Sequence, residues 1–185
     1  MTTTTDTNAG RTATALRNLY VVRFGFALVW AALLVLIGPA SGPVSVALLV
    51  IYPLFDVAAA IIDLRSSKTA RPAAALYVNL ALSLLAAIGL AVTGASGAPA
   101  VLRVWGAWAI TAGIVQLIVA IGRRRLGGQW AMILSGGIST IAGTGFILQA
   151  GTPAASLTSL AGYATVGGIF FLVSALRLHR TAKST

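Results

Sequence analysis

The 185-residue chain has no cysteine and no glutamate, and Asp6, Asp56 and Asp63 are its only acidic residues. Without cysteine it can form no disulfide, thiolate metal site or thiol nucleophile. His179 is the single histidine, so zinc-protease motifs and Cys–His pairs are excluded. Two aspartates in one apolar run are thin support for a metal cluster. We therefore expect a protein that is not an enzyme and binds no metal or cofactor.

Charge is scarce as well. Only 9% of the residues are charged and 58% are hydrophobic, whereas soluble domains are about 25% charged. A transmembrane helix needs about 20 apolar residues to cross about 30 Å of hydrocarbon. The sequence therefore predicts an all-α membrane protein, with a disordered leader (1–18), a transmembrane domain (19–178) and a basic tail (179–185). The six expected spans are 19–37, 43–64, 72–93, 100–121, 127–149 and 156–177.

The basic residues indicate an orientation. The chain has 13 Lys and Arg residues. All of them except Arg23 and Arg103 lie in the leader, in segments 65–71 and 122–128, or at the C-terminal end. The positive-inside rule then places both termini in the cytoplasm, in the inner or plasma membrane of a cell. The basic loops could attract anionic lipid headgroups. Because the net charge of +10 follows this loop pattern, we expect no nucleic acid partner.

Three pairs of spans follow one plan. Each pair turns through a short loop rich in Gly, Ala, Ser and Pro and returns towards a basic cluster. The returning segments DVAAAIIDLR (56–65), GIVQLIVAIG (113–122) and GIFFLVSALR (168–177) align with one another. The pattern predicts three hairpins in a parallel repeat. It lowers the expectation of the inverted repeats common in secondary transporters.

The last third of the chain, residues 127–178, has a set of sequence landmarks. They are Gly128 and Trp130 at the start of a span, Gly136 and Gly143 within it, and Pro153 in a turn. With them this part of the chain resembles the HdeD family of small bacterial membrane proteins. The first hairpin, with Pro39 and Pro43 in its turn, fits more loosely. The resemblance implies a six-helix inner-membrane protein associated with acid or general stress tolerance, and it supplies no catalytic residues.

Small residues recur at helical spacing. Ser135, Ser139 and Gly143 fall on one face of the fifth span, and Gly113 and Gly168 belong to similar pairs in the fourth and sixth. In lipid, close packing through such residues is a main source of helix association. We expect these faces to pack within the bundle, and the alternative is a homo-oligomer interface.

Asp56 is the most informative polar residue. It lies about 12 Å inside the cytoplasmic edge of its span, at eight residues of 1.5 Å, and aligns with Gly113 and Gly168. It should therefore face the bundle interior, on the same face as Tyr52. A carboxylate at that depth needs a partner or a proton, and we expect Arg23 to pair with it. The structural interpretation is an ion pair that joins helices one and two, and the functional one is a protonatable group.

Four other polar or aromatic features have simpler explanations. Asp63 is expected to be an interfacial carboxylate paired with Arg17, Arg23 or Arg65. Asn79 and Gln116 can each bond a neighbouring helix. Arg103 should reach the outer interface, with its neighbours Trp105 and Trp108 as belt residues.

Two functions remain open. The first is a stress-associated membrane protein of HdeD type that acts through helix packing or oligomerisation. The second is a small channel or proton-linked transporter that uses Asp56, Asn79 and Gln116. A water-filled path through these residues would favour the second, and a sealed bundle with Asp56 paired to Arg23 would favour the first.

Overall fold

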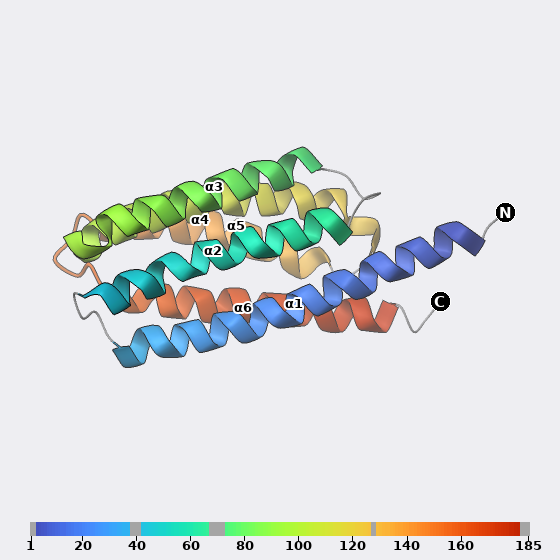
Figure 1. Ribbon diagram of the computed structural model, residues 1–185, viewed down its shortest axis with the longest axis horizontal. Helices are drawn as coiled ribbons and strands as arrows, with labels where there is room; N and C mark the ends of the chain where they lie inside the picture. Colours follow the sequence, from blue (N-terminus) through green and yellow to red (C-terminus); the bar gives the residue numbers. More distant parts are fainter. Residues whose placement is uncertain (1–2, 38–41, 67–72, 127–128, 182–185) are drawn as a thin grey trace.

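A computed structural model of the chain describes residues 3–37, 42–66, 73–126 and 129–181. Within these ranges the chain forms α-helices, two short 3-10 segments and no strand (Figure 1). The helices are α1 (Thr3–Ile37), α2 (Pro43–Ser66), α3 (Ala73–Thr93), α4 (Ala98–Gly122), α5 (Gln129–Gln149) and α6 (Thr158–Thr181), with η1 (Gly94–Ser96) before α4 and η2 (Arg124–Leu126) after it.

Proline and glycine mark the helix starts. Pro43 is the first residue of α2, and Pro99 lies in the first turn of α4, where a missing backbone N–H breaks no intrahelical bond. Gly97 precedes α4 with a φ of 94°, a conformation that glycine adopts without steric cost. Pro53 is different because it lies inside α2. It provides no donor for the carbonyl of Leu49, and the helix continues past it.

The six helices form a closed ring. Each helix packs against the one before and after it in the sequence, and α1 packs against α6 to close the ring. Both termini lie at one end of the bundle, together with the ends of α2 and α4 (Figure 1). We call this the terminal end and the opposite one the turn end, and we name the two halves of the bundle accordingly. The observed order agrees with six consecutive antiparallel spans.

The most extensive interfaces are α4–α5, α1–α6 and α2–α3. The expected hairpins, α1–α2, α3–α4 and α5–α6, are also neighbours but share less contact. Each helix therefore shares more contact with a helix of a neighbouring hairpin than with the other helix of its own hairpin. The parallel repeat itself remains a prediction.

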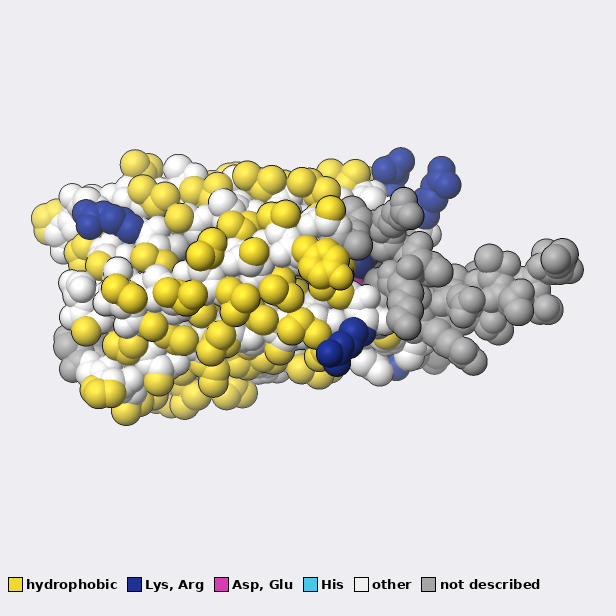
Figure 2. All heavy atoms as spheres, turned by 45° about the horizontal axis from the view of Figure 1, so that its top comes forward, with side chains coloured by type: hydrophobic (Ala, Val, Ile, Leu, Met, Phe, Trp, Pro, Cys, Tyr) yellow, Lys and Arg dark blue, Asp and Glu magenta, His cyan; other side chains and the backbone are white. Residues whose placement is uncertain are grey.

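The outer surface of the ring is apolar. Large hydrophobic side chains are exposed along every helix, among them Val29, Tyr77, Ile88, Ile141 and Leu148. On the face shown in Figure 2, hydrophobic side chains run the length of the bundle, whereas Lys and Arg side chains lie near its ends. All six helices are long and apolar enough to cross a bilayer. An apolar surface of this extent is stable only when it is buried, and lipid can bury all of it. The fold is therefore that of a multi-pass membrane protein.

Two expectations from the sequence are wrong. Residues 3–18, expected to be disordered, belong to α1, which extends past the other helices at the terminal end (Figure 1). Trp105 and Trp108, expected at the outer interface, are buried, with exposed fractions of 0% and 7%. Both indoles point into the ring because their helix face is the one that meets the other helices. Arg103, on the opposite face, is exposed as expected.

Candidate functional site: a polar cavity inside the ring

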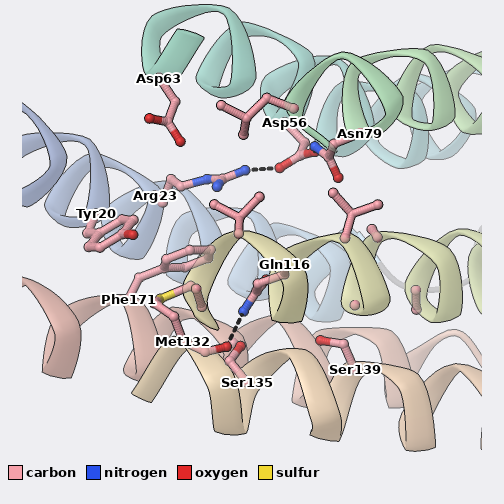
Figure 3. A pocket seen from close by; sticks show the side chains of 18 of the residues that line it. Tyr20, Arg23, Asp56, Asp63, Asn79, Gln116, Met132, Ser135, Ser139 and Phe171 are labelled. Carbon is pink, nitrogen blue, oxygen red and sulfur yellow. Dashed lines mark hydrogen bonds and ion pairs between the residues drawn. The ribbon is translucent and has the colours of Figure 1, made fainter. Parts of the chain in front are cut away.

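A cavity of about 120 Å³ lies inside the ring, and all six helices line it (Figure 3). Its polar side chains come mainly from the terminal half of each helix. At the other end, Tyr52, Trp108 and Tyr163 separate it from the core of the turn half. The lining includes Tyr20, Arg23, Asp56, Asp63, Asn79, Gln116, Arg123, Gln129, Ser135 and Ser139. Asp56, Asn79 and Gln116, which come from three different helices, therefore meet in one space.

Arg23 and Asp56 form the ion pair that the sequence predicts, from Nη2 to Oδ1 (Figure 3). The second carboxylate oxygen of Asp56 accepts hydrogen bonds from Asn79 Nδ2 at 2.7 Å and Ser83 Oγ at 2.8 Å. Ser83 in turn accepts a bond from Trp108 Nε1 at 3.1 Å. The carboxylate is thus held by α1 and α3 at once. This is the kind of full pairing that a charge needs when it leaves water.

The partner found for Asp63 corrects the sequence analysis. Arg123 Nη1 donates to Asp63 Oδ2 at 2.7 Å, and the Arg123 side chain is only 1% exposed. The sequence analysis had assigned Arg123 to the exposed basic loop and considered only Arg17, Arg23 and Arg65 as partners. One signal could have found it. Arg123 lies two helical turns after Gln116, so both side chains occupy the same inward face of α4.

Gln116 and Asn79 bond neighbouring helices, as expected. Gln116 Nε2 donates to the backbone carbonyl of Met132 on α5 at 3.0 Å (Figure 3), and Asn79 bonds Asp56 on α2. Ser135 and Ser139 are buried against the cavity, and Ser139 accepts a hydrogen bond from Tyr163 at 3.0 Å. The serines therefore add hydroxyls to the cavity in addition to packing.

The glycines pack helices of one chain together. A Cβ on Gly113 would lie 2.7 Å from the carbonyl oxygen of Gly136, and one on Gly143 would lie 2.6 Å from that of Gly106. The relation is reciprocal, so two glycine pairs spaced two turns apart hold α4 against α5. A Cβ on Gly168 would likewise lie 3.1 Å from the Cβ of Ala27 on α1. Gly113, Gly143 and Gly168 therefore pack helices together within the bundle.

Tyr52 marks the boundary between the cavity and the turn half. Its ring lies 4.7 Å from that of Trp30, 5.4 Å from that of Trp105 and 6.0 Å from that of Trp108. The aromatic cluster lies among buried hydrophobic residues contributed by all six helices, with Phe146 as the contribution of α5. Sequence reasoning placed Tyr52 on the face of Asp56, but it did not foresee the three tryptophans around it.

Other cavity residues were missed because nothing in their local sequence marks them. Tyr20, Gln129 and Tyr163 line the cavity, but each is an ordinary polar residue within or beside an apolar run. Among the residues that the structure describes, no three His, Cys, Asp or Glu side chains cluster as a metal site would require. The cavity offers instead two guanidinium groups, two carboxylates, amides and hydroxyls.

Comparisons of the chain with protein-family models, curated proteins and solved structures found no match. The resemblance to the HdeD family therefore remains a prediction from the sequence.

Proposed function

We propose that this membrane protein is a small carrier that binds a polar solute in its central cavity and uses Asp56 as part of the binding site. The observation that carries the proposal is that Asp56, Asn79 and Gln116 line one cavity inside the ring. Interiors normally contain few voids larger than a water molecule, so a polar space of this size supports a binding role.

A carrier fits the cavity better than an open channel does. The turn half of the ring is filled by buried side chains such as Trp30, Leu90, Leu102, Trp105 and Leu160. A cavity that ends at a packed core can hold a solute, but passage across the membrane then needs a conformational change. We therefore propose binding inside the terminal half, followed by rearrangement of the turn half.

Filling the cavity tests the proposal. Ala112 lines the cavity on α4, and Ala107 lies on the exposed face of the same helix. Protein with Ala112→Leu should lose uptake in proteoliposomes across a panel of small radiolabelled acids, amines and sugars. Ala107→Leu adds the same side chain outside the ring and should behave like the parent. If the parent accumulates none of these solutes, or Ala112→Leu accumulates them equally well, the carrier proposal fails.

A stress-associated role is the second candidate, and one observation favours it. The Arg23–Asp56 pair and the glycine contacts between α4 and α5 join helices as a structural bundle requires. In this proposal the protein is not an enzyme and acts in acid tolerance of the HdeD type. A deletion strain should then survive acid challenge poorly and be rescued equally by the parent and by Ala112→Leu. Rescue by the parent alone would assign the phenotype to the cavity.

Orientation belongs to the same proposal. We propose that the terminal end faces the cytoplasm of the cell, with its basic residues near anionic headgroups. The chain has no cysteine, so single cysteines give no background. Cysteines at Ser96 and Thr152 should react with an impermeant maleimide on intact cells, and one at Arg125 should not. The reverse pattern would invert the topology.

A homo-oligomer, left open by the sequence, gains no support from the small residues named for it. Gly113, Gly143 and Gly168 contact other helices of the same chain, so they are not available to a second copy. Sedimentation of the purified protein in detergent would decide whether another surface associates.

A further inference from the structure

One side of the Arg123 guanidinium has no acceptor. Nη1 is bonded to Asp63, but Nε and Nη2 are buried and have no hydrogen-bond partner among the described residues. Arg123 lines the cavity, and its side chain is 1% exposed. Buried N–H groups of a charged side chain are costly to leave unpaired. An acceptor that reaches these two groups from the cavity would remove that cost.

Nε and Nη2 form one edge of a planar fork. Two parallel N–H groups of this kind match the two oxygens of a carboxylate, which they bind in bidentate fashion. Asp63 occupies a different part of the same guanidinium, so it would orient the fork without blocking this edge. The geometry therefore favours a planar oxyanion over a single carbonyl or hydroxyl group.

The rest of the cavity limits the size and character of the ligand. About 120 Å³ is close to the roughly 150 Å³ cavity that holds a benzene-sized molecule. Leu76, Val115, Val119, Met132 and Phe171 contribute apolar wall beside the polar groups. A nucleotide or a sugar phosphate would not fit this volume. A carboxylate with a short hydrocarbon tail would.

Charge balance adds a condition. The ionisable groups that line the cavity are Tyr20 and Arg23 on α1, Tyr52, Asp56 and Asp63 on α2, Arg123 on α4 and Tyr163 on α6, whereas the lining residues of α3 and α5 are not ionisable. With the tyrosines neutral, two cations balance two anions. A further anion would leave the site with a net negative charge, which is costly away from water unless one proton enters with it. An aspartate displaced from its arginine is the group that could hold that proton.

We infer that the cavity binds a short-chain carboxylate through Nε and Nη2 of Arg123, together with one proton. The inference rests on the proposed function, since it names the solute class of the same cavity. It adds Arg123 as the residue that selects for a carboxylate.

The test uses propionate and its neutral isostere propionamide, titrated calorimetrically into the full-length protein in detergent. The parent should bind propionate and not propionamide, and its affinity should rise about tenfold for each unit of falling pH if one proton is taken up. Arg123→Lys retains the charge beside Asp63 but lacks the fork, so propionate affinity should fall about tenfold to a hundredfold. Arg103→Lys, an exposed change on the same helix, should leave the affinity unchanged.

Three results would overturn the inference. They are equal binding of propionate and propionamide, an unchanged affinity in Arg123→Lys, and no propionate binding by the parent. An affinity that does not change with pH would show that no proton is taken up and would overturn that part of the inference. Should Arg123→Lys not fold, the comparison of the two probes on the parent still decides. If Ala112→Leu abolishes uptake of some other solute while the parent ignores propionate, the carrier proposal stands and this inference falls.

Discussion

The two halves of the ring are built on the same helices but are filled differently. In the turn half, Trp30, Leu90, Leu102 and Trp105 meet across the ring and are at most 1% exposed. In the terminal half the inward positions of α4 and α5 carry small residues such as Ala112 and Ser135, and a cavity remains. The space thus accompanies small inward side chains, because volume that no large side chain fills is left open.

Polar groups follow the same division. Both ion pairs lie in the terminal half, from Arg23 to Asp56 and from Arg123 to Asp63. In the turn half, Trp105 Nε1 is buried and finds no acceptor among the described residues. Charge therefore gathers where space allows ligands or water, and large apolar side chains exclude it elsewhere. Four sets of substitutions test how far the two halves differ.

The largest effect is expected from Arg123→Gln in the terminal half. It removes the Arg123 side of the buried ion pair with Asp63, and breaking a buried pair on one side typically costs about 3–5 kcal/mol. Unfolding in detergent followed by circular dichroism would measure the loss. The double variant Asp63→Asn/Arg123→Gln should regain a large part of it. Arg103→Gln, exposed on the same helix, should change stability by less than about 0.5 kcal/mol.

Gly143→Val should come next, because the new side chain would meet the backbone of Gly106 on α4. Overpacking of this kind costs about 1–3 kcal/mol, and we expect the upper end since backbone cannot rotate away. Gly113→Val, in the terminal half, should lose as much. Equal losses would show that the contact between α4 and α5 supports both halves of the ring. Gly145→Val on α5 is the control, since a Cβ there meets nothing within 4 Å.

Arg23→Gln and Asp56→Asn should each cost about 1–3 kcal/mol, less than Arg123→Gln. Asn79 and Ser83 still donate to Asp56 when Arg23 is lost, and both partners of this pair are partly exposed. The double variant should recover part of the loss in melting temperature. Single variants as stable as the parent but without uptake would instead make Asp56 a functional proton site.

The smallest effect compares two tryptophans of the turn half. Trp30 Nε1 donates to the carbonyl of Leu48 at 2.6 Å, whereas Trp105 Nε1 has no acceptor. Trp30→Phe should therefore be less stable than Trp105→Phe by about 1 kcal/mol, the net value of one hydrogen bond. A larger loss in Trp105→Phe would indicate that its indole N–H has a partner such as a buried water.

Much of the architecture could be predicted because it depends on local composition. Apolar length and loop charge mark six spans, and the structure has six helices at nearly those positions. The pairing of Arg23 with Asp56 could be predicted because the two residues lie at similar depths in the membrane on neighbouring helices. The start of α1 was not predicted, because polar Thr-rich sequence indicates disorder on composition, while the structure continues the helix back to Thr3.

The sequence by itself thus determined the number of spans, their alternation and the Arg23–Asp56 pair. Only the tertiary structure decided that Trp105 and Trp108 point inward, that Arg123 pairs with Asp63, and that both ion pairs line one cavity. The physical reason is rotation about the helix axis. Hydropathy shows that a span is apolar all round, but which face meets the other five helices depends on contacts between residues far apart in the chain.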